Sequence, residues 1–413
     1  MPLTASLIHF LALYLGVLAL GAWFSRHKWP AANGHLLAGL VLGPLLLAGP
    51  ETLQDAALLT DLAIFFLLFQ VGLNTDPAPL MERPAASLAI ATGGFVLPLA
   101  LGYGAGQIIN AGPMASAAMG LVLAMSVTAV GPPALVNLEI CQSRTGHVIQ
   151  GAAAAGHYLS LGALSMGVAL AGSGGFQALA GAALPFALAW VLVRFVLGRI
   201  TLKVTADPKA YFVLCMAVAV AMGLTAHLTR TPLIVAAFLA GQVMRLETAN
   251  REILETIQTR LQFMVSGFLA PLVFGVLGAL ATFSGFSEFW MLAGLLFLAA
   301  LAGKIAGTTG AALACGRPAA DAAATGAALT GIGAAPLAAA AALLATNHAG
   351  TATTLAICPL LDGRQLAALI AALLASASVA PVLLRWIIDR NALAKEKSAF
   401  HHSLPPDPRS FGS

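Results

Sequence analysis

Long apolar runs alternate with short polar connections along almost the whole chain. A helix needs about 20 residues to cross about 30 Å of hydrocarbon, and most of the runs reach that length. The runs 33–48 and 231–243 are shorter. The pattern predicts an all-α polytopic membrane protein with about thirteen transmembrane helices. The runs are 7–24, 33–48, 56–73, 85–109, 115–138, 146–170, 176–197, 210–228, 231–243, 253–281, 289–313, 322–345 and 365–388.

The composition supports this class. Apolar residues make up 59% of the chain and charged residues only 9%, against about 25% charged residues in soluble domains. This hydropathy excludes a soluble enzyme, and the chain contains no Ser-His-Asp, metal-ligand or P-loop pattern. Four cysteines fall near separate runs without CxxC spacing, so neither a disulfide framework nor a metal site is indicated. We predict no catalytic residue, no metal and no cofactor.

Basic residues are divided unequally between the two sets of loops. With thirteen crossings, 17 of the 20 Lys and Arg residues lie on the side of the C-terminus, and only Arg230 and Arg364 lie on the other side. Basic residues accumulate on the cytoplasmic side, so the N-terminus is predicted outside and the C-terminus inside. The net charge of +4 therefore requires no nucleic-acid partner. The polar segment 391–413 is predicted to be a disordered cytoplasmic tail.

Lys304 is the remaining basic residue, and it lies inside the apolar run 289–313. A charge at the membrane centre costs about 2.5–3.5 kcal/mol, so such residues usually have a function. Two roles are open. Lys304 can contact a transported solute, or its ammonium can neutralise the negative C-terminal ends of interrupted helices. We favour the second role.

Two runs contain Gly and Pro where a helix would be interrupted within the membrane. Proline removes a backbone donor, and non-helical backbone at this depth is tolerated only inside protein or beside a water-filled cavity. Simple kinks are the alternative interpretation, because Gly and Pro are frequent in membrane helices. The interrupting residues are Gly131, Pro132 and Pro133 in the run 115–138, and Gly331, Gly333 and Pro336 in the run 322–345.

The two interrupted helices are the fifth and the twelfth of the predicted thirteen. If helices one to six and eight to thirteen form two repeats, each break falls on the fifth helix of its repeat. Helix seven connects the two repeats and inverts the orientation of the second one in the membrane. Paired interrupted helices at corresponding positions indicate the midplane site of a secondary transporter. We therefore predict two inverted six-helix repeats, with the two broken helices crossing near Lys304.

Four segments carry a family resemblance through their order and spacing. They are GHLLAGLVLGP at 34–44, FFLLFQVGLNTD at 65–76, AFLAG at 237–241 and GKIAG at 303–307. Together they resemble the monovalent cation:proton antiporter superfamily, in its Kef-type and bacterial sodium/proton exchanger branch, from residue 7 to about residue 389. The resemblance implies a homodimer in the bacterial plasma (inner) membrane. It also implies an elevator mechanism, in which a core (about 85–170 and 289–388) moves against the rest of the domain 1–390.

In that family the helix after the first break carries an Asp-Asp or Asn-Asp pair that binds the cation or protons. Aligned on residues 151–155, this pair becomes Gly156-His157. No carboxylate elsewhere in the apolar runs is found to replace it, since Asp61 is predicted near the start of a helix and not within it. An imidazole titrates near ~6.5, so His157 is the predicted proton site. The candidate transport site comprises His157, Lys304, Thr128, Ser126, Tyr158 and Ser160.

Less specific roles stay open for three of these residues. His157 can simply bond a neighbouring carbonyl, Ser160 can serve close helix packing, and Thr128 can cap a half-helix.

At the level of the whole protein, three functions remain. The first is proton-coupled antiport of Na⁺ or K⁺, and the second is a proton-linked carrier of an anion or neutral solute, which the positive half-helix N-termini would suit. The third is a transport-inactive membrane sensor or assembly partner. The predicted partners are protons, a small ion or solute, the lipid bilayer and a second copy of the chain.

Overall fold

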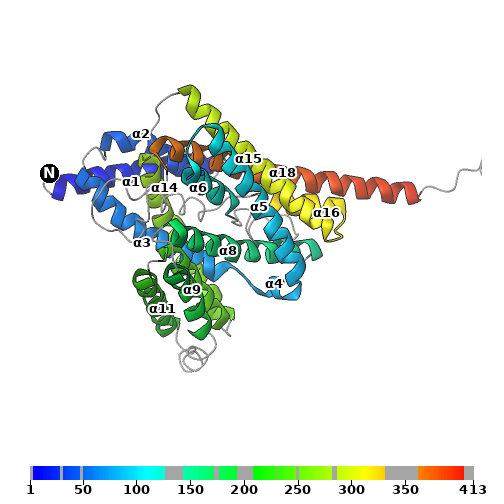
Figure 1. Ribbon diagram of the computed structural model, residues 1–413, viewed down its shortest axis with the longest axis horizontal. Helices are drawn as coiled ribbons and strands as arrows, with labels where there is room; N and C mark the ends of the chain where they lie inside the picture. The colour runs from blue at the N-terminus through cyan, green and yellow to red at the C-terminus, as the bar shows by residue number, and fades with distance from the viewer. Residues whose placement is uncertain are drawn as a thin grey trace, which may run out of the picture.

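The computed structural model describes most of the chain, and all regular elements in the described part are helices (Figure 1). The described residues are 3–27, 31–46, 50–125, 143–171, 176–192, 208–229, 231–247, 251–280, 286–330 and 361–403. The helices are α1 (Leu3–Arg26), α2 (Ala31–Leu46), α3 (Pro50–Asn74), α4 (Ala78–Glu82), α5 (Pro84–Ile108), α6 (Pro113–Ala124), α8 (Arg144–Ala171), α9 (Phe176–Val191), α11 (Pro208–Thr229), α12 (Leu233–Glu247), α13 (Arg251–Met264), the π-helical segment η2 (Val265–Leu269), α14 (Ala270–Leu280), α15 (Phe286–Ala314), α16 (Ala319–Leu329) and α18 (Gly363–Ser403).

Six helical segments of the described residues are long and apolar enough to cross a membrane. They are Ile8–Arg26, Pro84–Ile108, Lys209–Thr229, Glu252–Ala279, Glu288–Ala314 and Gly363–Ile387. Shorter apolar helices are Ala31–Gly43, Thr60–Asn74, Pro113–Ala124 and Leu233–Leu246. The predicted class, an all-α polytopic membrane protein, is thereby confirmed. The number of about thirteen crossings and the inverted repeats stay predictions.

One group of helices, here called the first bundle, consists of α1, α2, α3, α11, α12 and the continuous helix α13–η2–α14. Within it, α2 packs against α1 and α14, and α3 packs against α12 and α14. Glycines allow this close approach, because a methyl group on Gly72 would overlap the Phe238 carbonyl and one on Gly241 would overlap the Phe69 carbonyl. Lipid tails are as apolar as leucine, so the hydrophobic effect does not drive membrane helices together. Small residues promote their association because they let the backbones pack closely.

A second group, here called the second bundle, consists of α5, α6, α8, α15, α16 and α18. The helix α15 runs along α5 and also contacts α16 and α18, while α5 contacts α6 and α8. Its core contains small side chains such as Ala152, Ala312 and Ala327. The backbones of α5 and α15 approach at Gly93 and Gly307, where a methyl group on either residue would meet the carbonyl of the other.

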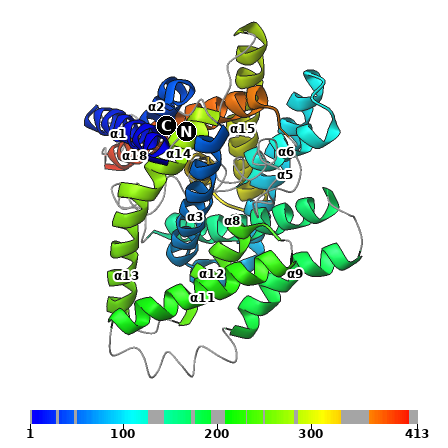
Figure 2. The same ribbon diagram turned by 90° about the vertical axis from the view of Figure 1, so that its left-hand side faces the viewer.

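Helix α8 lies where the two bundles meet. It contacts α5 and α16 of the second bundle, α12 of the first bundle, and the connecting helices α4 and α9. Figure 2 shows α8 near the centre of the molecule, with α12 beside it. A methyl group on Gly151 would collide with Ser87 and with the Pro79 backbone, so this glycine lets α8 pack tightly on α4 and α5. The position of α8 brings side chains of the run 146–170 to the first bundle.

Two helices extend beyond the limits that the apolar pattern predicts. Helix α3 begins at Pro50, where proline suits the first turn. The partly buried Asp61 therefore lies halfway along α3, and its predicted place near a helix start is wrong. Helix α18 continues to Ser403, into the segment predicted as a disordered tail from residue 391. The stretch ALAKEK at 392–397, at the start of that segment, consists of residues that favour helix.

Candidate functional site at the junction of the two bundles

Polar side chains gather at the C-terminal end of α3. The helix ends at Asn74, and Pro77 follows shortly after, where proline has no backbone N–H to give to a helix. The last carbonyls of a helix have no intrahelical donor, and in a membrane protein they need partners from elsewhere in the chain. Here the carbonyls of Gly72, Leu73 and Thr75 accept hydrogen bonds from side chains of α12 and α13.

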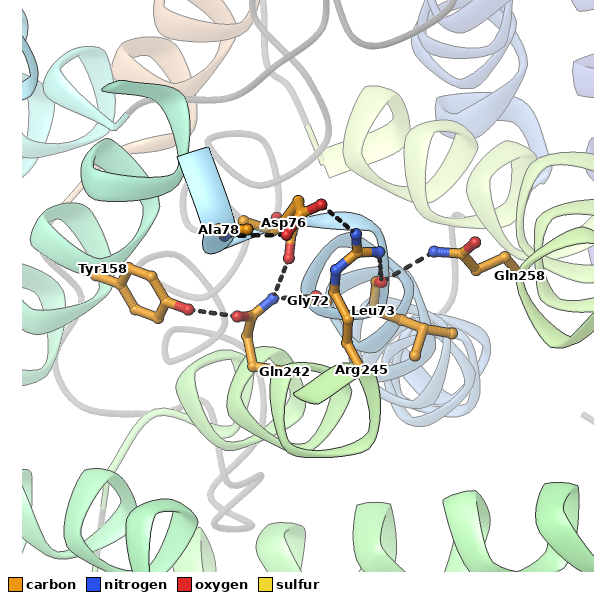
Figure 3. A network of polar contacts seen from close by, with 9 residues as sticks. Gly72, Leu73, Asp76, Ala78, Tyr158, Gln242, Arg245 and Gln258 are labelled. Atoms are coloured by element: carbon orange, nitrogen blue, oxygen red, sulfur yellow. Dashed lines mark hydrogen bonds and ion pairs between the residues drawn. The ribbon is translucent and has the colours of Figure 1, made fainter. Parts of the chain in front are cut away.

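Gln242 of α12 is central to this network and is buried, with 3% of its surface exposed. Its Nε2 donates to the carbonyls of Gly72 and Thr75, the latter at 2.7 Å. Its Oε1 accepts a hydrogen bond from the hydroxyl of Tyr158 on α8. Because both ends of the amide are engaged, its orientation is fixed, and the side chain links the first bundle to the second (Figure 3).

Arg245 lies one turn further along α12 and completes the cap of α3. Its Nη1 donates to the Leu73 carbonyl at 3.2 Å, and the same carbonyl accepts from Nε2 of Gln258 on α13 at 3.0 Å. Its Nη2 is 2.8 Å from Oδ2 of Asp76. The other carboxylate oxygen of Asp76 accepts from the backbone N–H of Ala78 at 3.0 Å. The ion pair and the cap together hold the connection between α3 and α4 (Figure 3).

An open depression of about 890 Å³ lies beside this network. Its polar lining includes Asp76, Glu82, Arg245, Glu255 and Gln258. Three carboxylates against one guanidinium give the depression a negative balance, which raises the local concentration of cations.

His157 lies on α8, next to Tyr158, and is 3% exposed. Its Nδ1 is 3.3 Å from the hydroxyl oxygen of Thr75, and its ring packs against Phe238 with the centroids 5.6 Å apart. Nε2 of His157 has no hydrogen-bond partner among the described residues. The imidazole is therefore anchored to the first bundle through one nitrogen, while the other nitrogen stays available.

Lys304 of α15 is also 3% exposed. Its ammonium donates to the carbonyls of Ala124 at 2.8 Å and Met125 at 3.0 Å. These carbonyls form the C-terminal end of α6, where the backbone leaves the helical conformation at Met125. A cation at this position compensates the negative end of a helix. The lysine is close enough to His157 for their charges to interact.

The structure thus brings together some of the predicted site residues. The charges of His157 and Lys304 are within range of each other, Tyr158 bonds Gln242, and Ser160 is buried on α8. The other predicted residues lie outside the described part of the chain. They are Ser126, Thr128, Gly131, Pro132, Pro133, Gly331, Gly333 and Pro336.

Sequence reasoning missed Thr75, Gln242 and the ion pair between Asp76 and Arg245. A signal was present for Gln242, which is an amide close to the end of the apolar run 231–243. A signal was present for Thr75 and Asp76 as well, since both belong to the segment 65–76 on which the family resemblance rests.

Comparison with known proteins places these features in a family. The family model "Sodium/hydrogen exchanger, transmembrane" matches residues 13–390. The Na(+)/H(+)-K(+) antiporter GerN of Bacillus cereus is 30% identical over 124 residues, which cover 30% of this chain and 32% of GerN. Cation/H(+) antiporter 18 of Arabidopsis thaliana is 26% identical over 323 residues, covering 70% of this chain and 38% of that protein. These alignments therefore span well under half the length of either relative.

Two further proteins match over most of their own length. The Na(+)/H(+) antiporter of Enterococcus hirae is 23% identical over 316 residues, covering 73% of this chain and 80% of that protein. The structure of the sodium proton antiporter MjNhaP1 from Methanocaldococcus jannaschii has a similar fold, with a TM-score of 0.58 and 15% identity, over 94% of this chain and 97% of that one. The chain belongs to the sodium/hydrogen exchanger family, within the monovalent cation:proton antiporter superfamily.

Proposed function

We propose that this protein exchanges protons for a monovalent cation, Na⁺ or K⁺, across the bacterial plasma membrane, with His157 as the proton acceptor. The observation that carries the proposal is a buried imidazole whose Nε2 has no partner among the described residues, close to a buried lysine at the junction of two helix bundles. Ionisable groups inside a membrane domain are costly and mark proton and ion pathways. The relatives named above are antiporters of the same class.

Exchange at such a site follows from competition between charges. A proton on His157 creates an imidazolium beside Lys304, and a bound metal cation adds the same charge at the same place. Like charges close together in a medium of low dielectric disfavour each other. The site therefore holds either the proton or the cation. For the cation, the proposed ligands are the oxygens of Ser126, Thr128, Tyr158 and Ser160.

Lys304 has a structural role in this proposal. Its ammonium bonds two carbonyls at the end of α6, so its charge is compensated without a carboxylate partner. Because these carbonyls compensate the charge of Lys304, the proposal does not require an acidic pair at Gly156 and His157, where the family resemblance implies one.

The proposal includes the topology derived from the basic residues, with the N-terminus outside and the C-terminus in the cytoplasm. Contacts between polar side chains support the grouping of the loops, because each joins residues assigned to one side. Asp76 forms an ion pair with Arg245, and Glu82 lies 3.4 Å from Nδ1 of His147, both on the predicted cytoplasmic side. Glu288 pairs with Arg364 on the outer side. The depression lined by Glu82 and Glu255 would then be the cytoplasmic entrance.

The mechanism we propose is of the elevator type, in a homodimer with about thirteen crossings per chain and two inverted repeats. The core, about residues 85–170 and 289–388, would carry the crossing of the broken helices at Gly131–Pro133 and Gly331–Pro336. The remainder up to residue 390 would be the stationary part. Support comes from the packing, since α5 packs against α6, α8 and α15, α15 packs against α16, and α8 meets α12 through the hydrogen bond from Tyr158 to Gln242.

The test is flux in proteoliposomes with an imposed pH gradient and a panel of Na⁺, K⁺, Li⁺ and chloride. Wild-type protein should exchange protons for Na⁺ or K⁺, and His157→Ala should lose proton coupling while remaining folded. Asp61→Asn is the matched control, because Asp61 is the partly buried carboxylate halfway along α3. Loss of coupling in Asp61→Asn with coupling retained in His157→Ala would move the proton site to Asp61 and contradict the proposal.

One observation favours a second candidate function, a proton-linked carrier of an anion or neutral solute. Among the described residues, the polar partners of Lys304 are backbone carbonyls, and the partner of His157 is a hydroxyl. A site of this composition has a positive balance. Chloride flux driven by the pH gradient, without cation flux, would establish this candidate in place of cation exchange.

A further inference from the structure

The hydroxyl of Thr75 determines which nitrogen of His157 carries the proton. A threonine hydroxyl has one hydrogen to donate. The Thr75 hydroxyl lies 2.8 Å from the Val71 carbonyl, which can only accept. The same oxygen is 3.3 Å from Nδ1 of His157. Since the hydroxyl hydrogen goes to Val71, Nδ1 must be the donor in the second bond. The neutral imidazole is then protonated at Nδ1, and its lone pair is on Nε2.

The position of Thr75 is itself held by the first bundle. Its backbone carbonyl accepts from Nε2 of Gln242 at 2.7 Å, and its backbone N–H donates to the Val71 carbonyl at 3.0 Å. Gln242 is in turn oriented by the hydroxyl of Tyr158, the residue after His157. Thr75 is 9% exposed and Gln242 is 3% exposed, so water does not readily replace these bonds. A hydrogen bond to the ring nitrogen sets the tautomer of a histidine in the same way at other protein sites.

We propose that Thr75 is a positioning residue for proton transfer, which fixes His157 in the Nδ1–H tautomer so that Nε2 receives the transported proton. Gln242 maintains the geometry by clamping the backbone of Thr75. The inference rests on the proposed function of His157. The step is a simple proton transfer, in which the Nε2 lone pair takes the proton and the imidazole becomes an imidazolium. The Nδ1–H bond to Thr75 is kept before and after.

The proton acceptor, the imidazole of His157, and the groups that orient it come from both bundles. His157 and Tyr158 belong to α8, whereas Thr75 and Gln242 belong to the first bundle. The tautomer is therefore fixed only while α8 is docked in the position seen here. When α8 leaves this position, Nδ1 and Nε2 are no longer distinguished by Thr75.

The direct test is ¹⁵N NMR of the full-length protein in nanodiscs, with ¹⁵N-labelled histidine and His157→Ala to assign the resonance. At a pH where His157 is neutral, wild-type protein should show the Nδ1–H tautomer. Thr75→Ser keeps the hydroxyl and should retain it. Thr75→Val removes the hydroxyl and should shift the tautomer ratio toward Nε2–H by about fivefold, because a hydrogen bond contributes about 1 kcal/mol net. A wild-type spectrum with Nε2–H would overturn the inference without any variant.

Transport provides the second readout. Thr75→Val should slow proton-coupled cation flux by about fivefold, in proportion to the lost tautomer preference. The separate variant Thr75→Ser keeps the hydroxyl and should transport at the wild-type rate. Thr225→Val is the matched control, because the Thr225 hydroxyl also bonds the carbonyl four residues earlier, that of Ala221 at 2.9 Å, and lies in α11. Equal slowing in Thr225→Val would reduce the effect of Thr75 to general helix stability and contradict the proposal.

The proposed proton site at His157 and the proposed role of Thr75 can be refuted separately. Retained proton coupling in His157→Ala refutes the proposed proton site, whatever the NMR spectrum shows. Conversely, a neutral His157 in the Nε2–H form refutes the role of Thr75 even if His157 is essential for flux.

Discussion

Residues of the candidate site differ in how readily the sequence identifies them. Lys304 could be selected from the sequence because a charge within an apolar run is costly and therefore noticeable, and His157 because it falls where the family resemblance implies an acidic pair. Thr75 was not singled out, although it lies in the segment 65–76 that carries the family resemblance, because a threonine at the end of a helix is ordinary. Its importance depends on the imidazole that packing brings to it from a residue far away in the chain. Side-chain partners of this kind arise from the tertiary fold, which no local pattern encodes.

Lys304 allows a prediction that separates its two possible roles. In Lys304→Met the carbonyls of Ala124 and Met125 lose their donor inside the protein. A buried acceptor left without a partner costs about 1–3 kcal/mol, so the melting temperature should fall, and Lys304→Arg should recover part of the loss. Thermal unfolding in detergent measures both variants. An unchanged melting temperature together with abolished flux would assign Lys304 to solute contact instead.

At the scale of elements, apolar periodicity predicted where helices lie but not which helices touch. The short runs 33–48 and 231–243 became α2 and α12, and α12 proved to be the helix that supplies Gln242 and Arg245 to the site. Contact between α3 and α12 depends on Gly72 and Gly241, each of which faces the backbone of the other helix. The sequence contains 42 glycines, so nothing local distinguishes these two.

The contact between α3 and α12 predicts a strong effect of a small substitution. Gly72→Ala would place a methyl group against the Phe238 carbonyl, and separating the helices would also stretch the bonds from Gln242. Overpacking of this kind costs about 1–3 kcal/mol, so Gly72→Ala should unfold at a lower temperature and lose flux. Gly104→Ala in α5 is the control, because a methyl group there meets no atom within 4 Å. Equal melting temperatures for the two variants would show that the helices separate easily.

At the scale of the whole molecule, the paired charged side chains join residues that the thirteen predicted crossings assign to the same side. Which of the two sides is cytoplasmic is a prediction that rests on the distribution of basic residues along the sequence. The membrane class and the family were predictable from hydropathy and from the segments of family resemblance. The depression and the network beside it were not, because they form only when α3, α4, α12 and α13 come together.

The orientation predicts which face of the membrane gives access to each ion pair. In a background without the native cysteines, Glu255→Cys introduces a thiol into the depression, and Glu288→Cys introduces one at the opposite ion pair; both side chains are exposed. A membrane-impermeant maleimide added to intact cells should label Glu288→Cys and leave Glu255→Cys unmodified. Inverted membrane vesicles should give the reverse pattern. Glu255→Cys labelled from outside would place the negatively lined depression on the outer face and reverse the assignment of both termini.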